Sequence, residues 1–210
     1  MITPPTQSTY QSDRKTTILR FENDDSHPMT GEYYCRGGIC WPVVPRTGAG
    51  GIAIGHAVMV GFNLQTKCYT VFEDVEFRCI DPILENGRMT FEGIANWLNN
   101  CWARYFCHYF YYNAPELVHR TYLMQVLRSE MVSPKPAFIE IPWQSDDQVL
   151  PVFWSLINTK RLKQSSAAIK DQARQCQGAL GSVELALYPA VYALTCALVA
   201  MERWPWRERI

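Results

Sequence analysis

Residues 31–62 read GEYYCRGGICWPVVPRTGAGGIAIGHAVMVGF, and the second half of this stretch is the clearest strand pattern in the chain. Successive side chains of a strand point to opposite faces of its sheet. From residue 52 to residue 62 one face carries Ile, Ile, His, Val, Val and Phe, and the other carries Ala, Gly, Ala, Met and Gly. Because both faces are apolar, the pattern predicts a strand buried on both sides, with a closely packed element over the small residues.

Shorter strand patterns surround this strand. The other extended segments are expected at residues 16–21, 32–35, 39–44, 68–72, 75–80 and 138–141. Turns are expected at Arg36–Gly38, Asn63–Thr66 and Glu73–Asp74, where Gly, Asn and Asp favour a change of direction. The segments up to residue 80 predict an antiparallel meander, and residues 138–141 predict an added edge strand.

After residue 87 the hydrophobic period changes from two residues to about 3.6 residues. Helices are expected at residues 91–111, 115–131, 147–157, 166–177 and 189–203. The first has apolar residues almost all round its axis, which is typical of a helix in a core or an interface. We expect it to pack on the small face of the strand at 52–62.

The predicted fold class is α+β, with an N-terminal antiparallel β-sheet packed against a mostly helical C-terminal half. Residues 1–15 are polar and contain two prolines, so a flexible arm is expected there. Residues 16–210 are long enough for a single α+β domain with a full core, β-rich over 16–83 and helix-rich over 90–205.

The equal numbers of basic and acidic residues exclude a strong electrostatic field over the whole protein. Lys and Arg together number 20, as do Asp and Glu, so the formal net charge at pH 7 is zero and does not draw the protein to nucleic acid or acidic membranes. Charged residues make up only 19% of the chain, whereas it holds 7 Trp, 11 Tyr and 9 Phe. A surface poor in charge and rich in aromatic residues favours burial under protein partners.

The cysteines are expected to be reduced. The first fifteen residues contain no apolar segment typical of a signal peptide, and several cysteines lie in apolar runs where a thiol packs as a small hydrophobic group. These features favour a cytoplasmic protein without disulfides.

Cys40 and His56, with Asp74 or Asp81 as the acid, are the candidate catalytic set of a Cys-His hydrolase. The segments Ile39–Trp41 and Gly55–Gly61 resemble those around the nucleophile and the base of papain-like cysteine peptidases. That family separates its Cys and His by roughly 130 residues or more, whereas Cys40 and His56 are sixteen apart. The resemblance therefore implies no papain-like fold, and a core histidine hydrogen-bonded to backbone is the competing interpretation.

No metal site and no cofactor are predicted. Zinc prefers four convergent Cys or His ligands. Cys35, Cys40 and His56, with Cys68 or Cys79, were the nearest approach to such a set, but the chain contains no C-x-x-C pair.

Residues 160–174 form a locally basic stretch that contains Lys160, Arg161, Lys163, Lys170 and Arg174. Such a stretch is able to contact the phosphates of nucleic acid. No aromatic residue lies within it, so the stacking component of a single-strand site is not expected, and a solvated helix face is the competing interpretation.

The C-terminal region carries two further expectations. Residues 185–201 lack charge but are shorter than the roughly 20 apolar residues that span a bilayer, so a buried helix is expected and membrane association is not. Beyond it, Arg203, Trp204, Trp206 and Arg207 are candidate partner-binding residues, because Trp and Arg dominate interface hot spots.

The leading functional prediction is a non-enzymatic cytoplasmic subunit or adaptor that acts through protein–protein contacts in a larger assembly. Two alternatives remain open. One is the Cys-His hydrolase, and the other is a nucleic-acid-associated protein that uses the stretch 160–174.

Overall fold

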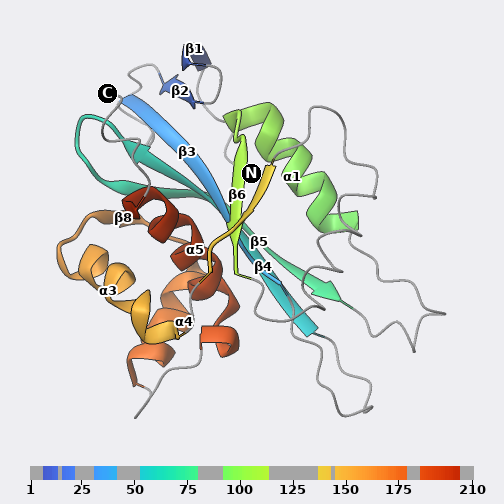
Figure 1. The fold of residues 1–210 in the computed structure, drawn as a ribbon, viewed down its shortest axis with the longest axis vertical. Coiled ribbons are helices and arrows are strands. Elements are labelled where there is room, and N and C mark those ends of the chain that lie inside the picture. The colour runs from blue at the N-terminus through green and yellow to red at the C-terminus, as the bar shows by residue number, and fades with distance from the viewer. Residues whose placement is uncertain are drawn as a thin grey trace.

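The computed structural model describes residues 7–13, 16–21, 31–41, 53–79, 92–113, 137–142, 145–178 and 185–203. In this part of the chain a single mixed β-sheet of eight strands crosses the molecule (Figure 1). Helix α1 covers one face, and α3, α4 and α5 lie on the other side. The α+β fold class is thus confirmed.

The sheet is antiparallel in its N-terminal part and parallel where later segments join it. The antiparallel strands are β1 (Gln7–Asp13), β2 (Thr16–Phe21), β3 (Gly31–Cys40), β4 (Ala53–Asn63) and β5 (Tyr69–Cys79). The parallel additions are β6 (Tyr109–Tyr112) on β3, β7 (Ala137–Glu140) on β6 and β8 (Leu162–Gln164) on β5. The edge strand predicted at 138–141 corresponds to β7.

The helices divide between two cores. Helix α1 (Glu92–Tyr105) packs in the first core, and α3 (Leu150–Asn158), α4 (Ala167–Gly178) and α5 (Pro189–Arg203) surround the second. Two short 3₁₀ turns, η1 (Asp146–Gln148) and η2 (Leu185–Leu187), precede α3 and α5. Pro151 lies in the first turn of α3, where a missing N–H does not interrupt the helix.

Strand β4 is buried on both faces, as its alternation predicts. Val58 and Val60 contact the core of α5, whereas Ala57 and Met59 contact the core of α1. The predicted contact of α1 with the small face is therefore confirmed. The space beside the glycines on that face is filled by aromatic rings of β5, with Phe77 against Gly55 and Phe72 against Gly61.

Two turns predicted inside the sheet do not form. Residues Arg36–Gly38 continue β3 as one strand, because the ring of Phe110 and the backbone of α5 pack where side chains would stand on Gly37 and Gly38. Residues Glu73–Asp74 continue β5. A β-bulge shifts the register at this point, since Met59 pairs with Glu73 whereas the next residue, Val60, pairs with Val71.

Other boundaries also differ from the prediction. The helix expected to reach residue 111 ends at Tyr105, and Phe106 has a φ of 47° that turns the chain into β6. Strand β1 lies in the segment expected to be a flexible arm, and β8 lies in the basic stretch where no strand is predicted. The helix expected at 115–131 falls outside the described residues.

Helix α5 starts at Pro189, and its residues from Ala190 to Met201 are buried, so the predicted buried C-terminal helix is confirmed. Within the described ranges, no helix combines the length and the apolar character needed to cross a membrane.

Candidate nucleic-acid interface

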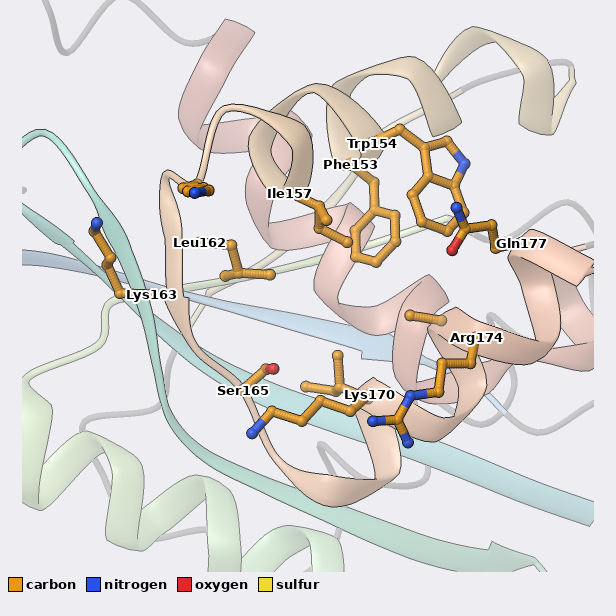
Figure 2. A pocket seen from close by; sticks show the side chains of 12 residues that line it. Phe153, Trp154, Ile157, Leu162, Lys163, Ser165, Lys170, Arg174 and Gln177 are labelled. Carbon is orange, nitrogen blue, oxygen red and sulfur yellow. The ribbon is translucent and has the colours of Figure 1, made fainter.

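A pocket of about 450 Å³ opens between α3, β8 and α4 (Figure 2). We call it the basic pocket. Its basic residues are Lys160, Lys163, Lys170 and Arg174, its apolar residues are Phe153, Trp154, Ile157, Leu162, Ile169 and Ala173, and its uncharged polar residues are Ser165 and Gln177. None of the described residues that line the pocket is acidic, and Asp171 of α4 is an acidic neighbour outside the lining that pairs with Arg174.

Helical spacing places the α4 residues of the pocket in two rows. Lys170, Arg174 and Gln177 recur at intervals of four and three residues, so they share one exposed face of the helix. Ile169 and Ala173 form the neighbouring row, and Ile169 packs in the core while it lines the floor of the pocket. Arg174 donates a hydrogen bond to Asp171 at 3.0 Å, but the two side chains are 76% and 64% exposed. Ion pairs between exposed side chains contribute little free energy, so Arg174 is easily released from this pair.

Lys160 reaches the pocket from an unusual backbone conformation. It has a φ of 54° and follows the last residues of α3. The N–H of Lys160 bonds to the carbonyl of Ile157, and the N–H of Arg161 bonds to that of Leu156, which is the hydrogen-bond pattern of a Schellman motif. Glycine usually occupies this left-handed position, so the lysine carries a backbone cost of about 1–2 kcal/mol.

The structure separates two of the predicted basic residues from the pocket interior. Arg161 donates to Glu202 at 3.1 Å and to the carbonyl of Lys67 at 3.2 Å, so its charge ties β8 to the end of α5. Lys163 lines the pocket near its edge, but its side chain extends away from the centre (Figure 2). Alternation along β8 gives the inward position to Leu162 instead.

The aromatic residues of the pocket are not predicted from the basic stretch, because they lie on the helix that precedes it. Trp154 is partly buried and lines the pocket, and its ring meets Phe153 edge to face with centroids 4.9 Å apart. Gln177, which lies beyond the basic stretch, lines the same pocket. An aromatic pair in the turn of helix before a basic segment is the signal that could have indicated them.

A partly buried hydrogen-bond network fixes the start of α4. His56 Nε2 lies 2.8 Å from Asp74 Oδ2, and the Ser166 hydroxyl donates to the same oxygen at 2.8 Å. The Ser166 oxygen also accepts the N–H of Ile169, as an N-cap residue does. Burial raises the pKa of Asp74, but the hydrogen bonds from His56 and Ser166 outweigh burial and hold that pKa below its ordinary value.

The candidate catalytic residues Cys40 and His56 are directly paired across β3 and β4, so their side chains lie on one face. Asp74 supplies the acid of this set, and Asp81 lies outside the described residues. Cys40 is only 4% exposed, and burial raises the pKa of its thiol well above the ordinary value. The nucleophilic form of cysteine is the thiolate, which this environment disfavours.

The remaining candidates are not brought together as a site. Cys35 and Cys40 lie in different cores on opposite faces of β3. No cluster of three or more His, Cys, Asp or Glu side chains able to hold a metal ion occurs in the part of the chain that the structure describes. Arg203 ends α5, and Trp204, Trp206 and Arg207 lie outside the described residues.

Comparison with known proteins finds similarity in structure but none in sequence. No protein-family model matches the chain, and no curated protein matches it in sequence. Among solved structures, the crystal structure of the fowlpox virus Holliday junction resolvase superposes with a TM-score of 0.40 at 6% sequence identity, covering 81% of this chain and 99% of that chain. At this identity no residue role of that enzyme is assigned to this chain.

This comparison contradicts the leading functional prediction. The solved protein is named as a resolvase, whereas the leading prediction was a non-enzymatic subunit or adaptor, and that prediction is not retained. Of the residues named for the two alternatives and described by the structure, Lys160, Lys163, Lys170 and Arg174 are exposed, whereas Cys40 and His56 are buried.

Proposed function

We propose that this protein binds nucleic acid through the basic pocket. The observation that carries the proposal is the concentration of Lys160, Lys163, Lys170 and Arg174 around one pocket without an acidic neighbour in its lining. In a chain with equal numbers of basic and acidic residues, such segregation creates a local positive field that the net charge conceals.

Exposure of the charges supports this function. Lys160, Lys170 and Arg174 are all exposed, so they are free to exchange water and counterions for phosphate oxygens. Backbone phosphates attract such residues by releasing condensed counterions, and each contact contributes to affinity. Arg161 has a structural partner in Glu202 and is not part of the proposed contact surface.

The test is a titration of a fluorescein-labelled single strand against the protein over a range of salt concentrations, read by anisotropy. We expect the logarithm of the affinity to fall linearly with the logarithm of salt. The double variant K170A/R174A should bind more weakly and lower the slope by about 1.4, since each phosphate contact with a single strand contributes about 0.7.

Lys67→Gln is the matched control, because Lys67 is an exposed lysine that does not line the pocket. It should leave affinity and slope close to those of the wild type. Binding that does not weaken with salt, or an equal loss in K67Q and in the single variant K170A, would contradict the proposal.

A further inference from the structure

We infer that the basic pocket receives an unpaired base, stacked on Trp154, and that the nucleic acid recognised is therefore single-stranded. This inference rests on the proposed function and adds the form of the ligand. It starts from the difference in chemical character between the basic edge of the pocket and its apolar interior.

The interior of the pocket is unsuited to phosphate alone. Ile157, Leu162 and Ile169 line it between the basic side chains, and together they offer no hydrogen-bond donor from their side chains. A phosphate would gain electrostatic attraction from the basic side chains at the edge of the pocket. Over these apolar residues it would lose its hydrogen bonds to water without replacing them. A nucleobase has the complementary character, because its flat faces favour apolar contact while its attached phosphates stay at the basic edge.

Trp154 provides a prepared stacking surface. Figure 2 shows its indole at one end of the pocket, on α3, with Lys170 and Arg174 on the facing helix α4. Edge-to-face contact with Phe153, which is fully buried, restrains the indole before any ligand arrives. A base that stacks on a ring already held in place loses less conformational entropy than one that must order its partner.

Polar side chains in the same lining suit the edge of a base. Gln177 carries both an amide donor and a carbonyl acceptor, and Ser165 carries a hydroxyl group that both donates and accepts. Amide side chains pair with base edges in this way. The volume of about 450 Å³ lies within the range of roughly 300–1,000 Å³ typical of small-molecule sites.

The occupant must be unpaired. In a duplex each base is covered on both faces by its neighbours, so it reaches a protein pocket only after it leaves the stack. A single strand presents bases at much lower cost, and the same aromatic and basic combination is found in sites for single strands. We therefore expect a single strand to bind more tightly than a duplex of the same sequence.

The experiment compares three labelled ligands on the full chain: an oligonucleotide, the same backbone with abasic sites, and the duplex. The oligonucleotide should bind most tightly. Trp154→Leu, which keeps an apolar side chain without an aromatic face, should weaken its binding by about 5- to 150-fold. The salt slope and the binding of the abasic strand should stay unchanged, because the phosphate contacts remain.

Trp154→Phe is the conservative partner of that variant and should recover most of the affinity. Because Trp154 also packs on the core, thermal unfolding of both variants checks that each is folded at the assay temperature. If W154L unfolds, the abasic comparison in the wild-type protein gives the answer without a variant.

Three results would overturn the inference. An abasic strand that binds as tightly as the complete oligonucleotide, or a duplex that binds more tightly than the single strand, would do so and leave the proposed function intact. A free mononucleotide that competes as well as the oligonucleotide would also overturn it, by making the ligand a nucleotide instead of a strand. If none of the three ligands shows salt-dependent binding, the proposed function itself fails.

Discussion

The imidazole Nε2 of His56 lies 2.8 Å from the carboxylate Oδ2 of Asp74, and Ser166 shares that oxygen. His56 lies on β4, Asp74 lies on β5 and Ser166 caps α4, so one carboxylate joins the centre of the sheet to the helix that presents Lys170 and Arg174. This connection makes the shape of the basic pocket dependent on residues outside it.

Replacing Asp74 with Asn should therefore lower the free energy of unfolding. The change removes the charge from two hydrogen bonds, and hydrogen bonds to charged groups contribute about 1.5–3 kcal/mol each. We expect a loss of about 2 kcal/mol in urea unfolding. Asp147→Asn, which removes an exposed carboxylate, is the control and should change stability by less than about 0.5 kcal/mol. Equal midpoints for the two variants would show that the network does not stabilise the fold.

The same carboxylate predicts a pH dependence. Asp74 has a folded-state pKa below its ordinary value of 3.8, so the folded protein binds this proton more weakly than the unfolded chain does. Its contribution to stability is complete above the ordinary value and is lost as the pH falls through the lower folded-state pKa. The difference in unfolding free energy between the wild type and D74N should shrink as the pH falls below about 4. A difference that persists unchanged at lower pH would refute this assignment.

Substitution of Lys160 should change the stability of the fold and the affinity for an oligonucleotide in opposite directions. Lys160→Gly removes the left-handed strain and should raise the free energy of unfolding by about 1 kcal/mol, while it weakens oligonucleotide binding through the lost charge. Lys160→Ala is the matched control, since it loses the same charge but keeps a Cβ. It should bind as weakly as K160G without the gain in stability. Chemical unfolding and anisotropy on the three proteins separate the effects, and unchanged binding in both variants would remove Lys160 from the proposed interface.

At Gly38 the backbone of α5 lies close against the sheet. A side chain at this position would collide with the carbonyl of Ala193 and the backbone N of Ala197, neither of which moves without the helix. Gly38→Ala should cost about 3 kcal/mol or more, which corresponds to roughly 6–12 °C in the melting temperature of a domain of this size. Gly178→Ala, at an open position near the end of α4, should be neutral or slightly stabilising. A G38A protein with the melting temperature of the wild type would disprove the close contact.

Local pattern was sufficient for much of the fold. The alternation around His56 indicated a strand with two buried faces, and the position of Pro189 indicated the start of the last helix. These features depend on periodicity and on the chemistry of single residues. The turn expected at Arg36–Gly38 was wrong because glycine also serves where another backbone or ring packs closely, and only the positions of Phe110 and α5 distinguish the two uses.

The basic pocket shows a second limit of prediction from sequence. The basic stretch was visible in the sequence, but its value for binding depends on neighbours that the linear order does not reveal. Arg161 was assigned to the same surface as Lys170, yet Glu202 at the far end of the chain holds its charge. Conversely, no aromatic residue lies within the basic stretch, but Trp154 of α3 lines the same pocket as Lys170 and Arg174 of α4.

By itself, the sequence determined the α+β class, the doubly buried strand β4, the extent of most helices and the basic character of residues 160–174, because each follows from contacts and preferences within a short segment. Only the tertiary structure decided which charges stay exposed, which aromatic ring joins them and which carboxylate anchors α4. The pairing of His56 with Asp74, of Arg161 with Glu202 and of Trp154 with the face of α4 joins segments separated along the chain. Their proximity is set by how the helices pack on the sheet, and local sequence does not encode it.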